Sequence, residues 1–225
     1  MTCVVETDTY VDIDYLGPYA ESGQFLAICG LSGSGKSTLL FNTIRAYPTD
    51  VTFIERTTTR SVRKDDNMYA KEIFHISDRE YEERRSADEF FLYRIKSESH
   101  KSGLARDSFE NKARQFALLG TTFHIESIDK ILSCLPMTPA IFISATVEQC
   151  LERTSRREKP TIEALAKKKA KLAREKPQFD ALIERHQSKP NTRVLQSPLD
   201  VGTPEYARFF DEAIGLLRST GRLLP

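Results

Sequence analysis

The most constraining feature of this 225-residue sequence is a glycine-rich segment, Gly30 to Thr38, that lies between an apolar run and a helical pattern. The run before it, Gln24 to Cys29, has the composition of a buried strand, and apolar residues from Leu39 to Ile44 follow at helical spacing. Its pattern is Gly30-x-x-x-x-Gly35-Lys36-Ser37, in which glycines let successive backbone N–H groups converge on a phosphate at a helix N-terminus. The context therefore predicts a strand, a phosphate loop and a helix, in that order.

The side chains of this segment suit a nucleoside triphosphate with Mg²⁺, most simply Mg-ATP. We expect the ATP-binding residues to be Gly30, Ser32, Gly33, Ser34, Gly35, Lys36, Ser37 and Thr38. Lys36 is expected to bridge the β- and γ-phosphates, and the hydroxyl of Ser37 to bind Mg²⁺. An ordinary glycine-serine turn before a helix needs no lysine at this offset, so the sequence favours phosphate binding over a purely structural turn.

The rest of the chain alternates short apolar runs with helical patterns, which is typical of a parallel sheet covered by helices. Further strands are expected at Val51–Ile54, Thr121–Ile125, Ala140–Ser144 and Thr192–Leu195. Helices are expected at Lys36–Tyr47, Ser127–Leu135, Val147–Arg156 and Pro204–Leu217. The segment Tyr10–Leu16 has the alternation of an edge strand. The predicted fold class is α/β: a three-layer α/β/α phosphate-loop fold with a parallel core sheet.

Composition argues against several classes of protein. The formal net charge is only +1, so no global field favours nucleic acid or an anionic membrane as a partner. No apolar run is long enough to cross a bilayer, and the N-terminus lacks the basic and apolar segments of a signal peptide. The four cysteines form no C-x-x-C pair and the four histidines have no metal-ligand spacing. We expect a cytoplasmic protein without a zinc site.

Two stretches do not fit simple alternation. The polar stretch from Arg56 to Leu119 is too long for a crossover between strands, so it should be an inserted substructure beside the strand ends where ligands bind. The stretch from Arg153 to Glu175 is rich in Lys and Arg and predicts a local positive field. A charged, solvated helix is the plain alternative for its lysine-rich part.

A second phosphate site is predicted directly after the second strand. Arg60 and Arg63 lie three residues apart on a hydroxyl-rich stretch that begins at Arg56. Guanidinium groups and hydroxyls suit a phosphate monoester, although a solvated basic turn has the same composition. Because this loop leaves a strand next to the phosphate loop, it lies where an acceptor phosphate must be for in-line transfer.

Other phosphate-loop proteins are disfavoured by missing motifs. ABC-type ATPases share the G-x-S-G-S-G-K-S-T-L-L pattern, but the chain has neither their Leu-Ser-Gly-Gly signature nor an apolar run that ends in Asp-Glu. The Asn-Lys-x-Asp motif of GTPases is absent as well. The remaining class is that of kinases acting on small phosphorylated molecules.

Several motifs resemble those of guanylate kinases, in the family's order from Phe25 to Glu175. Residues 58–63 (TTRSVR) look like the T-T-R-x-x-R acceptor-phosphate motif, residues 77–81 like S-x-x-E-F, and residues 88–90 like G-E-F. Farther on, Arg153-x-x-x-Arg157 with Lys168 and Glu175 resembles the family's lid.

This resemblance implies an ATP-dependent kinase with three parts. They are a core (22–55, 119–152 and 176–225), an acceptor-binding insertion (56–118) and a helical lid (153–175), with an N-terminal extension (1–21). Arg153 and Arg157 would reach in on closure and neutralise charge on the transferring phosphoryl group, so Lys36, Arg153 and Arg157 are the expected catalytic residues. Arg60, Arg63 and Glu126 are the expected acceptor-binding residues.

The resemblance fails at the positions through which guanylate kinases recognise guanine. Leu92 replaces an expected carboxylate, and residues 100–103 (HKSG) keep a glycine but lose a tyrosine. In place of D-x-D the chain has His124-Ile125-Glu126, where Glu126 keeps one carboxylate that could hold Mg²⁺ through water or face the acceptor. A site built to hydrogen-bond guanine discriminates through such groups, which argues against GMP.

Several interpretations of the function remain open. Residues 90–93 (FFLY) resemble the F-x-L-H segment of ribose 1,5-bisphosphate phosphokinases, and Ser127 matches a serine of theirs, which makes a sugar phosphate an alternative acceptor. A modified or pyrimidine nucleotide is a third possible acceptor. There are two alternatives that are not kinases. One is a catalytically silent guanylate-kinase-like binding module, and the other is a nucleotide-dependent switch or ATPase. The partner expected in every kinase reading is a small phosphorylated substrate; oligomeric state is not predicted.

Overall fold

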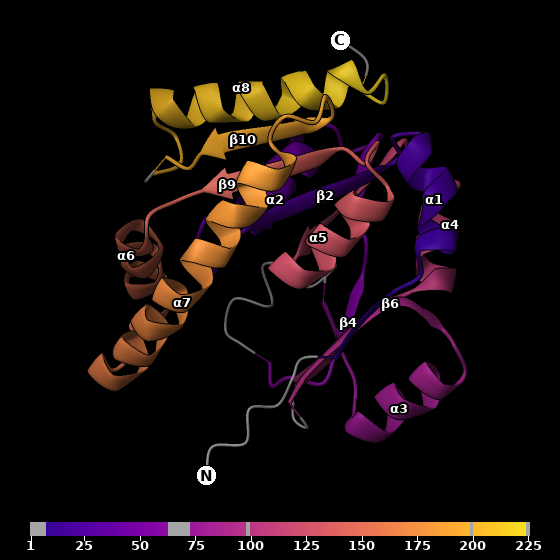
Figure 1. The fold of residues 1–225 in the computed structure, drawn as a ribbon, viewed down its shortest axis with the longest axis horizontal. Coiled ribbons are helices and arrows are strands. Elements are labelled where there is room, and N and C mark those ends of the chain that lie inside the picture. Colours follow the sequence, from indigo (N-terminus) through magenta and orange to yellow (C-terminus); the bar gives the residue numbers. More distant parts are fainter. Residues whose placement is uncertain (1–7, 63–72, 98–99, 199, 224–225) are drawn as a thin grey trace.

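The computed structural model describes residues 8–62, 73–97, 100–198 and 200–223, which form two sheets with helices packed on them (Figure 1). The core sheet is parallel, with strand order β10-β9-β2-β8-β3. Its strands are β2 (Phe25–Gly30), β3 (Val51–Phe53), β8 (Leu118–Phe123), β9 (Ala140–Ser144) and β10 (Thr192–Gln196). At the centre, Ala27 of β2 pairs with Thr121 on one side and Ala140 on the other. Every residue of β2 before Gly30 is buried, as expected for a parallel strand covered on both faces.

Helices cover both faces of this sheet. α2 (Lys36–Ala46) and α8 (Pro204–Ser219) pack on the face that carries Leu26 and Ile28. The opposite face carries Phe25 and Ala27 and shares one large apolar cluster with the remaining covering helices. These are α1 (Ile13–Glu21), α4 (Arg106–Ala113), α5 (Ile125–Cys134), α6 (Val147–Glu158) and α7 (Ile162–His186). The predicted three-layer α/β/α class with a parallel core sheet is confirmed.

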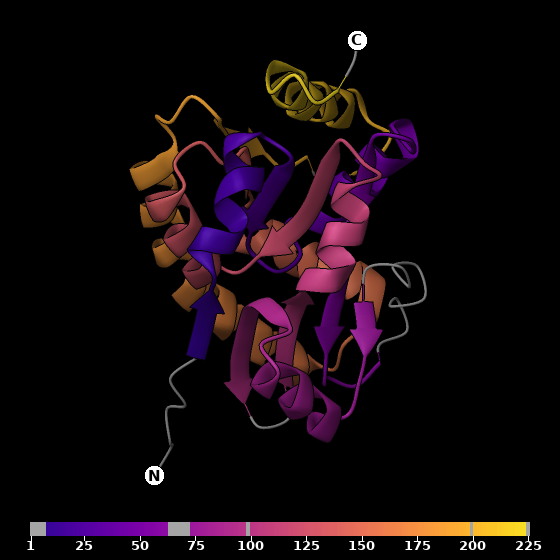
Figure 2. The ribbon, with the colours of Figure 1, turned by 90° about the vertical axis from the view of Figure 1, so that its right-hand side faces the viewer.

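A second, mixed sheet lies below the parallel sheet in Figure 2, with strand order β1-β6-β7-β4-β5. Its strands are β1 (Asp8–Val11), β4 (Arg56–Thr58), β5 (Ile73–His75), β6 (Phe90–Ser97) and β7 (His100–Ala105). α3 (Asp78–Ser86) packs on it through Tyr81, whose ring stacks on Phe90 with centroids 5.2 Å apart. The polar stretch between β3 and β8 therefore supplies every strand of this sheet except β1.

The N-terminal segment joins the two sheets. β1 pairs antiparallel with β6 of the mixed sheet, and α1 buries Leu16 and Ala20 in the core of the parallel sheet. Tyr10–Leu16 is therefore not one edge strand: the strand ends at Val11 and a helix begins at Ile13. The reason is local, because Asp12 caps the helix by accepting a hydrogen bond from the Tyr15 N–H at 3.0 Å.

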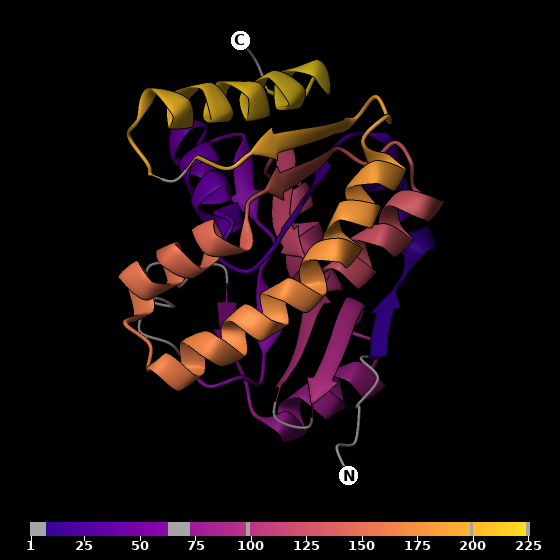
Figure 3. The same cartoon turned by 60° about the vertical axis from the view of Figure 1, so that its left-hand side comes forward.

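α6 and α7 form a hairpin that projects from the sheet, at the left of Figure 3. α6 begins with a reciprocal capping box between Thr146 and Gln149, which satisfies two backbone N–H groups. The hairpin turns at Lys159, which has a φ of 43°, and Thr161 caps α7. α7 then returns to the core, where Leu172, Phe179 and Leu182 are buried.

The strand and helix predictions hold elsewhere with small shifts. β9 has the predicted bounds, and β2, β3, β10, α2, α6 and α8 end within two residues of theirs. β8 begins three residues earlier than expected and stops at Phe123, because His124 already adopts the extended conformation of the cap of α5. In the part of the chain described, no helix has the length and apolar composition needed to cross a bilayer.

Candidate active site

The glycine-rich segment forms a tight loop between β2 and α2. Gly33 and Gly35 have φ angles of 92° and 97°, a left-handed backbone that side-chain-bearing residues rarely adopt. At Gly33 space is also limiting, because a Cβ atom would lie 2.7 Å from the carbonyl oxygen of Cys150 in α6. The loop therefore packs closely against α6, and α2 begins at Lys36 directly after Gly35.

Lys36 folds back over this loop. Its Nζ donates hydrogen bonds to the carbonyl oxygens of Gly30, at 2.8 Å, and Leu31, at 2.9 Å. Burial lowers the pKa of Lys36 below its ordinary value, although the thiols of Cys29 and Cys150 oppose the shift. An anionic phosphate would give this ammonium group a stronger acceptor than two neutral carbonyls.

Two long-range hydrogen bonds fix the loop, one to the segment that follows β10 and one to α6. The hydroxyl of Ser197, just after β10, donates to the carbonyl oxygen of Ser34 at 2.7 Å. Arg153 of α6 donates from Nη1 to the carbonyl oxygen of Gly33 at 3.1 Å, and its Nη2 binds the carbonyl oxygen of Pro198. The loop is thus held by two distant parts of the sequence, α6 and the segment after β10.

A cleft of about 690 Å³ runs from this loop to the mixed sheet. All the described residues predicted to form the site line it: Gly30, Ser32, Gly33, Ser34, Gly35, Lys36, Ser37, Thr38, Arg60, Glu126, Arg153 and Arg157. Arg63 lies outside the described residues. The cleft is basic, with Lys36, Arg56, Arg60, Arg94, Lys96, Arg153, Arg156, Arg157 and Lys171 against Glu126, Glu175 and Asp200.

The arginines of α6 have different environments. Arg153 is partly buried by its contacts with the phosphate loop, and this burial lowers its pKa. Arg157 is ion-paired with the adjacent Glu158. Arg156 bridges Glu152 at 2.5 Å and Asp200 at 2.6 Å, which ties the hairpin to the segment after β10. Arg153 is therefore already docked, whereas Arg157 lies farther along the hairpin.

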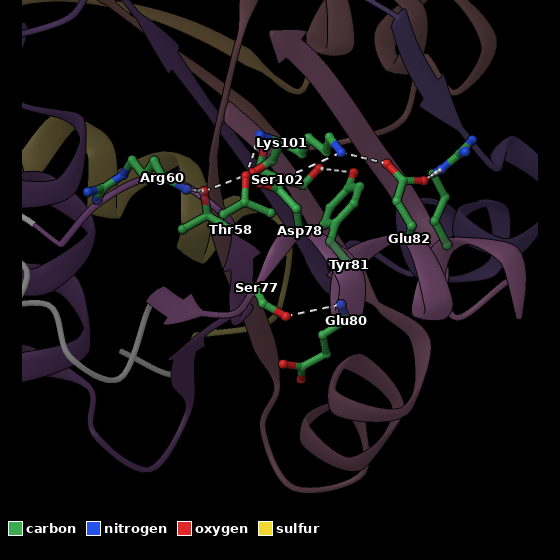
Figure 4. A network of polar contacts seen from close by, with 11 residues as sticks. Thr58, Arg60, Ser77, Asp78, Glu80, Tyr81, Glu82, Lys101 and Ser102 are labelled. Atoms are coloured by element: carbon green, nitrogen blue, oxygen red, sulfur yellow. Dashed lines mark hydrogen bonds and ion pairs between the residues drawn. The ribbon is translucent and has the colours of Figure 1, made fainter. Parts of the chain in front are cut away.

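The predicted acceptor side of the cleft lies on β4. Thr58 donates its hydroxyl to the carbonyl oxygen of Lys101 at 2.9 Å, and Arg60 lies two residues farther on (Figure 4). The carbonyl oxygen of Arg60 is 2.9 Å from Nδ1 of His75. Arg56, at the start of β4, reaches toward the core sheet instead and donates to the carbonyl oxygen of Thr122. Arg56 thus fixes the end of β8 to the mixed sheet.

The arrangement of loop, cleft and basic hairpin has a counterpart in a known family. A protein-family model described as guanylate kinase matches residues 22–200. The chain belongs to the guanylate kinase family. The match includes the phosphate loop, the strands of the mixed sheet other than β1, α3 and the α6–α7 hairpin.

A solved guanylate kinase structure agrees on the fold of this guanylate kinase family member. A guanylate kinase from Anaplasma phagocytophilum superposes with a TM-score of 0.54 and 16% sequence identity, over 88% of this chain and 85% of that chain. A gluconokinase from Sinorhizobium meliloti 1021 gives a TM-score of 0.38 and 13% identity, over 88% and 93% of the two chains. No curated protein sequence matches the chain. At this identity the guanylate kinase likeness shows the fold alone.

The cleft fits the Mg²⁺ that guanylate kinases generally use with ATP. Ser37 lies in the first turn of α2 and lines the cleft, and the carboxylate of Glu126 lines it from α5. Hydroxyl and carboxylate oxygens are ligands that Mg²⁺ prefers, with phosphate oxygens and water completing its shell. Among the described residues, no three His, Cys, Asp or Glu side chains gather as a metal site.

The positions at which the family recognises guanine carry different side chains in this member. Leu92 is buried in the apolar core instead of lining the cleft. Lys101 points away from the cleft, where its Nζ binds Glu82 at 2.7 Å and Asp78 at 3.4 Å (Figure 4). His124 replaces a carboxylate and faces the cleft, and its depth there, with the nearby Arg94 and Arg56, lowers its pKa well below the ordinary value.

Sequence reasoning missed Arg94, Lys96 and Ser197 as cleft residues. Arg94 and Lys96 lie two and four residues after Leu92 on β6, so the strand alternation that follows Leu92 carried the signal. Ser197 follows the last core strand and meets the loop across 163 residues of sequence, which no local pattern indicates.

Proposed function

We propose that this protein transfers the γ-phosphoryl group of Mg-ATP to the phosphate group of a small phosphorylated acceptor, as a nucleoside monophosphate kinase-like enzyme with altered base recognition. The observation that carries the proposal is the common cleft. The phosphate loop with Lys36 lies at one end, Arg60 of the acceptor side at the other, and Arg153 and Arg157 line the wall contributed by α6. Family membership supports a kinase.

The transfer itself needs positioning more than covalent chemistry. An oxygen of the acceptor phosphate forms a bond to the γ-phosphorus as the bond from that phosphorus to the β–γ bridging oxygen breaks. The electron pair of the broken bond leaves with ADP. Bound Mg²⁺ would neutralise charge on the β- and γ-phosphates, and Ser37 with Glu126 are the residues that would hold it, directly or through water.

Within this step, the chain's own groups bind and orient. Lys36 would exchange its two carbonyl partners for phosphate oxygens, and Arg60 would hold the acceptor phosphate in line. Arg157, with Arg153, would stabilise the charge of the transferring group. Closure of the α6–α7 hairpin as a lid would exclude water, which would otherwise be the acceptor.

Lys36→Ala tests the proposal. Wild-type protein and the variant would be incubated with Mg-ATP and a panel of nucleoside monophosphates, deoxynucleotides and sugar phosphates, with products identified by mass spectrometry. We expect the variant to lose at least about 100-fold in turnover, since charge stabilisation is the largest catalytic term. Lys130→Ala, an exposed lysine on α5 outside the cleft, is the matched control.

Thermal unfolding separates loss of binding from loss of fold. The Lys36→Ala protein should melt near the wild-type temperature without nucleotide and lose ATP-dependent stabilisation, which for a ligand at 100 times its Kd is about 2.7 kcal/mol. Wild-type turnover in the variant would overturn the proposal. Steady ATP hydrolysis by the wild type that no acceptor changes would instead favour the ATPase reading.

A further inference from the structure

Arg94 of β6 is a buried cation that lines the cleft and has unused hydrogen-bond donors. Its side chain is only 11% exposed, and its Nε is buried with no hydrogen-bond partner among the described residues. Its only ion pair in the described part of the chain is a long one, 3.6 Å from Nη2 to the carboxylate of Glu126, which is itself 47% exposed. A buried guanidinium with unused donors is costly unless something completes its hydrogen bonds, so we expect an anion to bind beside it.

Arg94 reaches from the mixed sheet toward the phosphate loop. Glu126, which its side chain contacts, lies in the first turn of α5, directly after β8. β8 pairs with β2 so that Phe123 lies opposite Cys29, and the phosphate loop begins at the next residue, Gly30. Paired strands are only about 5 Å apart. The guanidinium group of Arg94 therefore lies at the same end of the core sheet as the loop that is proposed to bind the donor phosphates.

Strand register places Arg94 in one row with the predicted acceptor loop. Arg94 pairs with Ser102, Ser102 pairs with Thr58, and Arg60 lies two residues beyond Thr58. From ordinary strand spacings, the Cα atoms of Arg94 and Arg60 are about 12 Å apart. Arg60 donates from Nη1 to the carbonyl oxygen of Ser61 at 3.0 Å, a neutral partner that a phosphate would replace. Two long arginine side chains can meet across this separation, so one phosphate group can bind both.

We infer that Arg94 binds the acceptor phosphate from the side opposite Arg60 and keeps this contact during transfer. The inference rests on the proposed function and adds a catalytic residue to it. As an acceptor oxygen bonds to the γ-phosphorus and the electron pair of the β–γ bridge leaves with ADP, negative charge is spread over the groups between Lys36 and Arg60. Arg94 neutralises this charge from the mixed sheet, as Arg153 and Arg157 do from α6.

A contact with the phosphate does not depend on what the phosphate is attached to, and this gives the test. Arg94→Met should lower kcat/KM roughly 10- to 100-fold for every acceptor that the wild type phosphorylates, the effect of losing a charge-assisted hydrogen-bonding pair. The acceptors would be the panel of nucleoside monophosphates, deoxynucleotides and sugar phosphates, with saturating Mg-ATP. The KM for ATP should be unchanged. Arg94→Lys, which keeps the charge but not the planar fork, should recover part of the loss.

A double-mutant cycle tests whether Arg94 and Arg60 bind one group. Residues that share a partner are energetically coupled, so the loss of kcat/KM in the Arg60→Met, Arg94→Met double variant should differ from the product of the two single losses by about threefold or more. Lys101→Met is the matched control, because Lys101 belongs to the neighbouring strand but its side chain points away from the cleft toward Glu82 (Figure 4). It should leave kcat/KM at the wild-type value. Unfolding measurements would confirm that each variant is folded.

Three results would overturn the inference while leaving the proposed function standing. One is a folded Arg94→Met protein with wild-type kcat/KM. Another is a loss confined to some acceptors, which would assign Arg94 to recognition of the base or sugar. The third is a double variant whose loss equals the product of the single losses. Failure of the proposed function looks different, since then the wild type phosphorylates no acceptor and Lys36→Ala has no effect on product formation.

Discussion

Arg153 donates a hydrogen bond from Nη1 to the carbonyl oxygen of Gly33 at 3.1 Å, across 120 residues of sequence. Its other terminal nitrogen binds the carbonyl oxygen of Pro198. One guanidinium group thus joins the phosphate loop, the α6–α7 hairpin and the segment after β10. The planar, forked shape of the group makes this possible, and burial does not remove its charge even though it lowers its pKa.

Replacement of Arg153 should therefore affect catalysis more than stability. We expect Arg153→Ala to lower kcat by at least about 100-fold, since arginines that stabilise transferring phosphoryl groups are typically worth more than this. Arg153→Lys should recover little, because a lysine lacks the planar fork with which Arg153 reaches the carbonyl oxygens of both Gly33 and Pro198. Single-turnover kinetics with saturating ATP measures the effect. A loss smaller than threefold in Arg153→Ala would remove Arg153 from the catalytic residues.

The phosphate-loop glycines make a matched pair. Gly33→Ala and Gly35→Ala should each cost roughly 1–2 kcal/mol, because both positions have a left-handed backbone. Only Gly33→Ala also meets α6, where its Cβ would lie 2.7 Å from the carbonyl oxygen of Cys150; at Gly35 the nearest atom is 3.7 Å away. We expect Gly33→Ala to weaken ATP binding more strongly, as measured by calorimetry. Equal affinities in the two variants would contradict this packing argument.

Ser197 should tune nucleotide affinity from outside the loop. Ser197→Ala removes the donor to the buried carbonyl oxygen of Ser34 at 2.7 Å. An unsatisfied buried acceptor costs about 1–3 kcal/mol, so we expect ATP to bind several-fold more weakly or the loop to lose rigidity. Hydrogen exchange of the loop amides, together with ATP titration, measures both. Ser219→Ala removes a hydroxyl that bonds within its own helix and is the control, for which both readouts should stay at the wild-type value.

Asp129 should give the protein an acid-dependent stability. Its carboxylate, on α5, accepts hydrogen bonds from Arg185 at 2.5 Å and His186 at 2.9 Å, both at the end of α7. Partial burial raises its pKa, but these hydrogen bonds outweigh burial and bring it below 3.8. A lowered pKa stabilises the folded state above pH 3.8, and that stabilisation is lost as the pH falls through the folded value.

Asp129→Asn is the test of this pH dependence. Because 33% of the Asp129 side chain is exposed, we expect the variant to lose about 1 kcal/mol or less in the free energy of unfolding at neutral pH. The difference from wild type should shrink as the pH falls well below 3.8. Urea unfolding across this range measures it. If the difference in unfolding free energy between Asp129→Asn and wild type stays constant with pH, the effect comes from side-chain packing and not from charge.

The parts of the site that local chemistry dictates could be predicted from the sequence. The loop from Gly30 to Thr38 is encoded by its glycines, Lys36 and the flanking strand and helix. The placement of Arg60 followed from its position after the second core strand. These features depend on residues that are close together in the chain, so their pattern is visible without the fold.

The rest depends on pairings that no local pattern contains. The alternation of β6 puts Arg94 and Lys96 on one face of the strand, but whether that face lines the cleft depends on the pairing of β6 with β7 and on where the mixed sheet lies. At Tyr10–Leu16, a strand-like alternation competed with the helix cap of Asp12, and the cap prevailed. Arg56 precedes the motif at residues 58–63, and its contact with Thr122 depends on the approach of β8.

The junction at Asp12 has a mechanical consequence for the molecule. Its backbone N–H donates to Phe91 of β6 at 2.7 Å, while its carboxylate caps α1 and contacts Arg106 at 2.7 Å. Since β1 belongs to one sheet and α1 packs on the other, Asp12 fixes the angle between the two sheets at this edge. β1 is one edge of the mixed sheet, and β4 lies three strands away from it. On that far side Arg56 of β4 binds the carbonyl oxygen of Thr122 in β8, so the two sheets are joined both at Asp12 and at Arg56, and the distance between Arg60 and the phosphate loop is held from both ends.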